Sequence, residues 1–141
     1  MLIETSVLIK ADRRSVWRVL ADVEQWPSWT PGVSRLTIVD GAALSSGAKV
    51  KMKQPKLPVT RWTVTDWREG EAFTWESTAP GVRSTAAHAL DDDGGGTRLR
   101  LRLEQTGSLA WLSKLIYLRL SRRYVEAEAR GLKQCCESGE T

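Results

Sequence analysis

The segment from about residue 108 to residue 136 constrains the fold of this chain more than any other. No proline interrupts it, Gly107 precedes it, and Ser108 can act as its N-terminal cap. At about 100° per residue, one broad apolar arc is expected to contain Tyr117, Leu120, Tyr124, Gly131, Leu132 and Cys135. The opposite side is expected to contain Arg119, Arg122, Arg123, Glu126, Arg130 and Lys133. The pattern predicts an amphipathic helix roughly 40 Å long that covers an apolar surface.

One acidic residue interrupts the apolar arc of this helix. Glu128 lies near the middle of the arc, with Ser121 beside it. Because an unpaired buried carboxylate is costly, Glu128 is expected to have a partner or to face a wet cavity. The alternatives are a slightly rotated helix that leaves Glu128 at the rim, and an ion pair with a sheet arginine such as Arg61. The surface under the helix is therefore either fully packed or hollow.

The residues before the helix predict strands that are joined by tight turns. Residues 2–10 and 98–104 alternate apolar with polar side chains, and the second run sets three leucines against three arginines. A period of two indicates five more strands, at residues 33–40, 48–54, 60–68, 72–78 and 82–90. The acidic and glycine-rich residues 91–96 predict a solvated turn. Regularly spaced hairpin strands favour one antiparallel sheet.

Two helical segments follow the first strand. Asp12 is a good N-cap, and apolar residues at helical spacing follow it, which predicts a helix at about residues 13–21. Residues 24–32 contain two prolines and a glycine, so one short helical turn is expected there, with Trp26 and Trp29 as apolar anchors. The predicted fold class is α+β: a curled seven-stranded antiparallel sheet around a long C-terminal helix, with two short helices after the first strand.

The composition is that of one soluble globular domain, residues 1–141, with 41% hydrophobic and 27% charged residues. Cys135 and Cys136 are adjacent, so no disulfide is expected between them, and two reduced thiols suit the cytoplasm. The N-terminus has no signal-peptide pattern, and no apolar run reaches the roughly 20 residues of a membrane helix. These observations predict a cytoplasmic protein without a transmembrane segment, either a monomer or a homodimer.

A set of short motifs occurs along the whole chain in one order. They are Ala11-Asp12, Val16-Trp17, Leu20-Ala21-Asp22, Trp26-Pro27-Ser28-Trp29, Trp62-Thr63-Val64, Phe73-Thr74-Trp75, Gly96-Thr97-Arg98-Leu99, and the final helix with Glu128, Gly131 and Leu132. In this order the set resembles the START-like (SRPBCC, helix-grip) superfamily, in particular its polyketide cyclase/dehydrase-type members. The resemblance implies a hydrophobic cavity between sheet and helix that holds a lipid-like or aromatic, polyketide-like small molecule. The fold alone does not specify a reaction.

His88 is the single histidine of the chain and a candidate site residue. It shares a strand face with Ala86 and Leu90, which directs it toward the helix. His88 is either a buried, hydrogen-bonded imidazole or a polar or proton-transfer group in the cavity. If His88 and Glu128 converge, they form the tentative catalytic pair, the general acid and base that cyclisation or dehydration needs. A carboxyl pKa raised by burial would strengthen that interpretation.

Apolar and aromatic side chains are expected to form the cavity wall, although such residues are more often core than ligand contacts. Phe73 and Trp75 share a strand face and make the best aromatic wall. Trp62 and Trp67 lie on opposite faces by parity, so at least one of them does not line the cavity. The predicted ligand-binding residues are Trp29, Leu57, Phe73, Trp75, Leu99, Leu101, Tyr117, Leu120 and Tyr124.

Other functional classes have little support in the sequence. One histidine and two adjacent cysteines cannot build the usual zinc site, and no phosphate loop or dinucleotide fingerprint is present, so no metal and no cofactor are expected. The stripe of Arg98, Arg100 and Arg102 lacks interleaved stacking aromatics, which disfavours nucleic-acid binding. The leading hypothesis is binding, transport or sensing of a hydrophobic small molecule. The alternatives are a cyclase/dehydratase-type enzyme that uses His88 and Glu128, and a module that binds a partner through a basic face.

Overall fold

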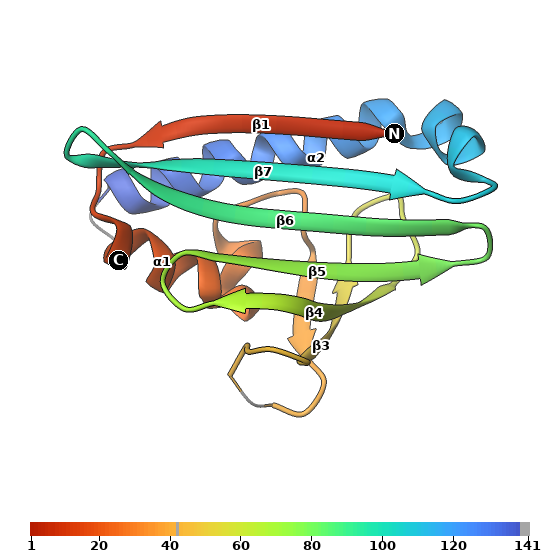
Figure 1. The fold of residues 1–141 in the computed structure, drawn as a ribbon, viewed down its shortest axis with the longest axis horizontal. Helices are drawn as coiled ribbons and strands as arrows, with labels where there is room; N and C mark the ends of the chain where they lie inside the picture. The colour runs from red at the N-terminus through yellow and green to blue at the C-terminus, as the bar shows by residue number, and fades with distance from the viewer. Residues whose placement is uncertain (42, 139–141) are drawn as a thin grey trace.

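A computed structural model describes residues 1–41 and 43–138 and confirms the predicted α+β class (Figure 1). All seven strands belong to one antiparallel sheet with the order β1-β7-β6-β5-β4-β3-β2. The strands are β1 (Leu2–Ile9), β2 (Arg35–Ile38), β3 (Lys49–Lys53), β4 (Thr60–Arg68), β5 (Ala72–Ala79), β6 (Val82–Asp93) and β7 (Gly96–Thr106). The first strand along the chain therefore pairs with the last.

Within residues 1–41 and 43–138, three helices cover one face of this sheet. They are α1 (Arg13–Ala21), the 3-10 helix η1 (Val23–Ser28) and α2 (Ala110–Glu137). Figure 1 shows α2 running along the sheet beside β1 and β7, and its C-terminal end lies against α1. The hydrophobic core fills the space between the sheet and the three helices, and its largest fully buried side chains are Trp26, Trp75, Phe73, Ile9, Leu20, Leu99 and Leu132.

The β6–β7 hairpin is longer than the sequence suggested. The predicted solvated turn at residues 91–96 is wrong in extent, because Asp91, Asp92 and Asp93 continue β6 and pair with β7. Arginines from β7 pair with two of these three carboxylates, and Arg13 of α1 lies 3.9 Å from the third, Asp92. Arg98 Nε is 2.9 Å from Asp93 Oδ2, and Arg100 Nε is 3.3 Å from Asp91 Oδ2. The turn itself contains Gly94 and Gly95, with φ of 59° and 91°.

Strand β2 is shorter than the predicted range of 33–40. It ends at Ile38 because the chain turns there, and the backbone N–H of Gly41 donates to the Ile38 carbonyl at 3.1 Å. Gly41 has a φ of 68°, which a glycine adopts without strain. Strand β2 pairs with β3 in the antiparallel sense from Arg35 to Ile38.

The C-terminal helix begins later than predicted, and its first half is not buried. Leu109 and not Ser108 holds the N-cap position, because Gly107, at a φ of 117°, turns the chain before it. The buried residues of α2 are Ala127, Ala129, Gly131, Leu132 and Cys136. Tyr117 of the predicted apolar arc is 36% exposed. The helix therefore covers the core with its second half only.

Candidate functional site

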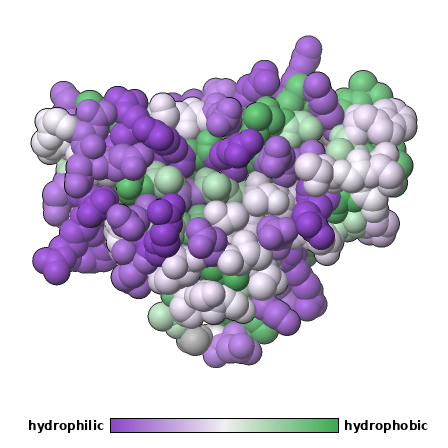
Figure 2. All heavy atoms as spheres, in the orientation of Figure 1, coloured by the Kyte–Doolittle hydropathy of each residue, from purple (hydrophilic) through white to green (hydrophobic). Residues whose placement is uncertain are grey.

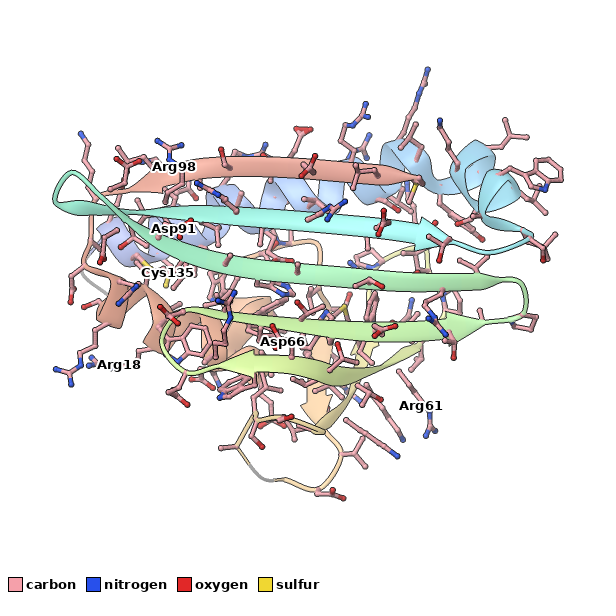
Figure 3. All side chains as sticks on the ribbon, viewed as in Figure 1. Arg18, Arg61, Asp66, Asp91, Arg98 and Cys135 are labelled. Carbon is pink, nitrogen blue, oxygen red and sulfur yellow. The ribbon has the colours of Figure 1, made fainter. Side chains whose placement is uncertain are left out.

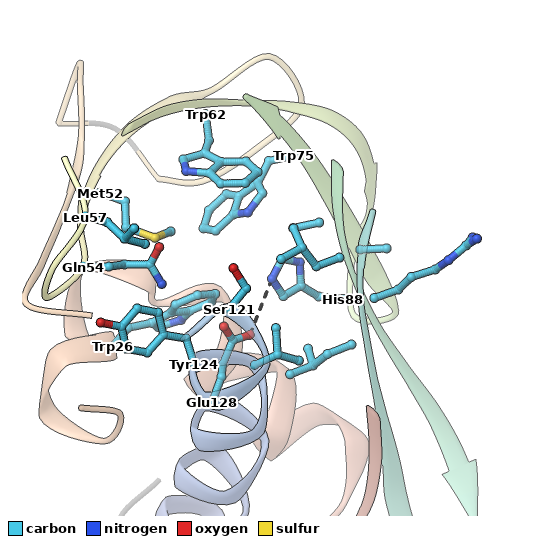
Figure 4. Close-up of a pocket in the computed structure, with 16 residues that line it drawn as sticks. Trp26, Met52, Gln54, Leu57, Trp62, Trp75, His88, Ser121, Tyr124 and Glu128 are labelled. Carbon is cyan, nitrogen blue, oxygen red and sulfur yellow. Dashed lines mark ion pairs between the residues drawn. The ribbon is translucent and has the colours of Figure 1, made fainter. Parts of the chain in front are cut away.

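A small cavity lies between the inner face of the sheet and the middle of α2 (Figure 4). We call it the inner chamber, and its volume is about 80 Å³. One water molecule needs roughly 10–15 Å³, so the chamber has room for several. It is lined by Trp26, Met52, Gln54, Leu57, Trp62, Trp75, Ala86, Ala87, His88, Leu101, Arg102, Leu103, Ser121, Tyr124, Val125 and Glu128.

His88 lies at the sheet side of the inner chamber and is 4% exposed. Strand register places it opposite Phe73, and the two rings stack with centroids 4.2 Å apart and an interplanar angle of 14°. The rings of Trp26 and Trp75 approach it at 5.7 Å and 5.3 Å. The imidazole is therefore enclosed by three aromatic side chains, an environment that favours its neutral form.

One hydrogen bond fixes the tautomer of His88. Its Nδ1 lies 3.2 Å from the backbone carbonyl oxygen of Phe73. A carbonyl oxygen can only accept, so Nδ1 carries the proton and donates it. In the neutral ring Nε2 is then an acceptor, and it faces the inner chamber and α2.

Glu128 reaches the same point from α2. Its Oε2 is 3.6 Å from Nε2 of His88, and its side chain is 16% exposed (Figure 4). Burial raises the pKa of Glu128 from 4.5 to about 8. Burial also lowers the pKa of His88 from 6.5 to about 4, although the hydrogen bond to Phe73 opposes this. Near neutral pH the pair therefore consists of a protonated carboxylic acid and a neutral imidazole.

The loop between β3 and β4 forms another part of the wall. The hydroxyl of Tyr124 donates to the carbonyl oxygen of Pro55, and the ammonium of Lys53 donates to the carbonyl oxygens of Gln54 and Leu57. Burial raises the pKa of the Tyr124 hydroxyl. These contacts hold the loop against α2 and place Leu57 over the cavity.

A second hollow adjoins the inner chamber. This outer chamber has a volume of about 340 Å³ and a largely apolar wall. Its wall includes Leu109, which precedes α2, and Leu112, Ile116 and Tyr117 from the first half of α2. Both chambers are lined by Gln54, Leu57, Trp62, Leu103 and Ser121, so they are contiguous. Ligand pockets commonly measure about 300–1,000 Å³, a range that the outer chamber reaches and the inner one does not.

The structure brings together the two residues predicted as a catalytic pair, His88 and Glu128. The inner chamber is also lined by four predicted ligand contacts, which are Leu57, Trp75, Leu101 and Tyr124. Tyr117 lines the outer chamber. Neither chamber is lined by the remaining four. Phe73 and Leu99 are fully buried in the core, Trp29 packs against Trp26 and α2, and Leu120 is half-buried on α2.

Sequence reasoning did not assign several cavity residues. Trp26 was expected only as an anchor of its turn, and its place in the wall depends on how η1 packs against β5. Trp62 shares the inner face with Val64, a parity signal that was visible in the sequence. Ser121 was noticed only as a neighbour of Glu128 in the apolar arc, and Gln54 gave no signal, because single polar residues beside a loop are common. In the described ranges, 1–41 and 43–138, no cluster of three or more metal-ligating side chains occurs.

Replacing Glu128 with glutamine should remove a pH-dependent cost of folding. Above about pH 4.5 an unfolded chain releases the Glu128 proton, whereas the native chain holds it up to about pH 8. The wild-type free energy of unfolding should therefore fall, relative to Glu128→Gln, as pH rises through that window. Between about pH 5.5 and about pH 7.5 the difference should change by about 2 kcal/mol in favour of the variant. Urea denaturation across this pH range measures the difference in the free energy of unfolding. His88 is present in both proteins, so its titration does not create the difference. Parallel pH profiles of the two proteins would contradict the burial of Glu128.

A curled antiparallel sheet that grips a long C-terminal helix, with a hydrophobic cavity between them, defines the START-like helix-grip class of proteins. The family model described as polyketide cyclase / dehydrase and lipid transport matches residues 2–137. The chain therefore belongs to this family, as the sequence motifs predicted. A search of curated protein sequences found no match.

Solved structures with the same fold span several activities. The chain is similar to TTHA0849 from Thermus thermophilus, with a TM-score of 0.78, 18% identity and 100% of both chains covered. It is similar to the Zhui aromatase/cyclase from Streptomyces sp. R1128, with a TM-score of 0.80, 17% identity, and 100% of this chain and 96% of that one covered. A norcoclaurine synthase point mutant from Thalictrum flavum has a TM-score of 0.76 and 13% identity over 100% and 96% of the two chains. At these identities the similarity shows the fold alone.

Proposed function

We propose that this protein binds a hydrophobic small molecule, lipid-like or aromatic and polyketide-like, across the two chambers. The observation that carries the proposal is the His88–Glu128 pair at the inner end of an otherwise largely apolar cavity. A few convergent polar groups in an apolar pocket are the usual arrangement for fixing the orientation of a ligand. The family description, which includes lipid transport, supports this interpretation, as does the norcoclaurine synthase of the same fold, which was solved in complex with a transition-state analogue. The cytoplasmic location stays a prediction.

The neutral state of the pair indicates the chemistry of the ligand's polar end. The acid form of Glu128 can donate a hydrogen bond, and Nε2 of His88 can accept one. A hydroxyl, a phenol or a carbonyl can use these groups without a net charge. Among the described residues, Arg102 is the one cation in the lining of the inner chamber, and it already pairs with Glu4 and Glu104. A ligand carboxylate would therefore lose its hydration without gaining a free counter-ion. We therefore expect an uncharged polar group at the pair and an apolar body in the outer chamber.

A cyclase/dehydratase-type enzyme is the second candidate, and one observation favours it. Nε2 of His88, the acceptor, lies 3.6 Å from the carboxyl group of Glu128. Both residues can therefore reach neighbouring atoms of one bound substrate. In a dehydration, His88 would take a proton from carbon while Glu128 gives its proton to the departing hydroxyl. The products are an alkene and water, and the two residues are left as imidazolium and carboxylate. Return of one proton from the imidazolium to the carboxylate restores the pair.

Binding of 2-naphthol and naphthalene should test the role of the pair, because the two probes differ by one hydroxyl. The wild type should bind 2-naphthol about tenfold tighter, since one well-placed hydrogen bond contributes roughly 1.5 kcal/mol. His88→Phe should bind naphthalene as the wild type does and lose the preference for 2-naphthol. Quenching of tryptophan fluorescence, with calorimetry as a check, measures both affinities. Equal affinity of the wild type for the two probes would overturn the proposed anchoring.

Glu128→Gln separates the two candidate functions, because glutamine can donate a hydrogen bond but cannot release a proton. A binding protein should keep its 2-naphthol affinity within a few-fold in this variant. An enzyme should keep binding and lose the conversion of a poly-β-ketone thioester, followed by mass spectrometry of the products. Turnover by the wild type that survives in the variant would exclude Glu128 as the acid.

A further inference from the structure

The first half of α2 carries a group of large apolar side chains that face solvent. Leu115 is 77% exposed, Trp111 64% and Ile116 59%. Trp111 and Leu115 are four residues apart, so they lie on one face of the helix. In Figure 2 hydrophobic residues gather at the end of the molecule where α2 begins. Side chains of this size seldom cluster in solvent without a function, so this group indicates a surface that another body covers.

Four cations lie on the same side of α2 as the apolar group. At about 100° per residue, Lys114 flanks the Trp111–Leu115 line on one side and Arg119 on the other. Arg122 and Arg123 continue the lines of Leu115 and Ile116 two turns further along the helix, about 10 Å away. The sequence from Gly107 to Val125 contains no acidic residue. We call Trp111, Leu115 and Ile116, together with these four cations, the docking face.

The charge of the docking face is not neutralised within the protein. In the described part of the chain, no ion pair involves any of its four cations. The arginines on the outer face of the sheet differ, since Arg98 pairs with Asp93, Arg100 with Asp91, and Arg102 with Glu4. The outer stripe therefore has little free charge, and the docking face has a local excess of positive charge.

The docking face also adjoins the opening of the cavity. Ile116 belongs to it and lines the outer chamber, as do its neighbours Leu112 and Tyr117. A body that covers the docking face therefore lies directly beside the outer chamber. An apolar molecule could then pass between that body and the chamber without crossing bulk water.

We propose that the docking face binds an anionic lipid surface, with Trp111, Leu115 and Ile116 in the interface and the four cations at the phosphate headgroups. An exposed tryptophan beside lysine and arginine is the combination that interfacial helices use. Among the helices of the described residues, none has the length and apolar content to span a bilayer. A second copy of this chain fits less well, because a symmetric contact would bring two sets of unpaired cations together.

Vesicle co-sedimentation tests the proposal with pure phosphatidylcholine and with phosphatidylcholine that contains a quarter phosphatidylglycerol. The wild type should bind the anionic vesicles at least roughly tenfold more tightly, and added salt should weaken that binding. Trp111→Gln/Leu115→Gln and Lys114→Gln/Arg119→Gln should each lose roughly tenfold or more. These positions are exposed and glutamine is a good helix former, so the fold should persist, which circular dichroism checks.

Lys49→Gln/Lys51→Gln is the matched control. It removes the same charge from exposed positions of β3, far along the chain from the docking face, and should bind as the wild type does. The wild type should also show a blue shift of tryptophan emission on anionic vesicles, and Trp111→Phe should lose most of it. Equal losses in the control and in Lys114→Gln/Arg119→Gln would overturn the proposal, because only net charge would matter. Absence of vesicle binding, or a dimer that Leu115→Gln dissociates, would overturn it too. The 2-naphthol test is independent, so the docking proposal and the proposed function can fail separately.

Discussion

Replacing Trp26 with alanine should lower the free energy of unfolding by about 3–5 kcal/mol, the usual cost of truncating a buried tryptophan. Trp26 is 1% exposed, and its ring contacts Trp29, Trp75 and His88. Its indole N–H donates to the carbonyl oxygen of Leu20 at 2.9 Å. Leu20 lies in the last turn of α1, where carbonyl groups have no partner inside the helix. The alanine variant therefore loses packing and leaves this carbonyl without its donor. Urea denaturation measures the change.

Trp111→Ala is the matched control for this prediction. It removes the same side chain from a site that is 64% exposed, so the free energy of unfolding should change by less than about 0.5 kcal/mol. Trp26→Ala should also enlarge the inner chamber by the volume of the lost indole ring, because Trp26 forms part of the chamber wall. A loss at Trp26 no larger than that at Trp111 would show that η1 does not pack as described.

Replacing Gly131 with alanine should destabilise the protein by about 3 kcal/mol, although alanine is the better helix former by about 1 kcal/mol. A Cβ atom at this position would lie 2.0 Å from the backbone carbonyl oxygen of Trp29. No rotamer change can relieve a contact with backbone, so α2 or the segment after η1 must move. Because this part of α2 holds the buried Leu132 and Ala129, the movement would open the core. Thermal and urea denaturation both measure the loss.

Arg130→Ala provides the control for Gly131→Ala, since it makes the neighbouring residue alanine at an exposed position. Its stability should match the wild type within about 0.5 kcal/mol. If Gly131→Ala proved more stable than the wild type, helix propensity would outweigh the contact. The close approach of Trp29 to α2 would then be contradicted.

The alternation of side chains made most of the sheet predictable. Arginines and leucines alternate in β7 from Arg98 to Leu103, and the burial of Leu99 and Leu101 follows from that alternation alone. The shared face of Phe73 and Trp75 was predictable for the same reason. A period of two reports which face a residue occupies as long as the strand stays regular.

Strand β4 shows where that argument stops. Parity places Trp62 and Trp67 on opposite faces, but the register shifts between Val64 and Asp66, a β-bulge. Beyond the shift Trp67 pairs with Phe73, and its ring lies 5.8 Å from that of Phe73 on the inner side. The prediction of opposite faces is therefore wrong. One inserted residue reverses the parity of everything after it, and nothing in the local sequence marks the insertion.

The candidate site was partly predictable. An acidic residue in the apolar arc of α2 and a histidine on an inward strand face were visible in the sequence, and both lie on the cavity. The distance between Glu128 and His88 was not predictable, because it depends on the position of α2 along the sheet. Periodicity also could not show that Tyr117 lies where α2 leaves the core, since an apolar arc continues along a helix whether or not a sheet lies beneath it.

The pairing of β1 with β7 has a consequence for how the chain is made. Leu2 pairs with Glu104 and Ile9 with Thr97, so β1 cannot pair with β7 until the chain as far as Glu104 has left the ribosome. Contacts this distant in sequence make folding slow compared with that of a helical protein of equal size. During synthesis the apolar side of β1, with Ile3 and Ile9, has no native partner. The nascent chain therefore has a window in which an unpaired strand can meet other chains, and its yield should depend on the speed of translation and on chaperones.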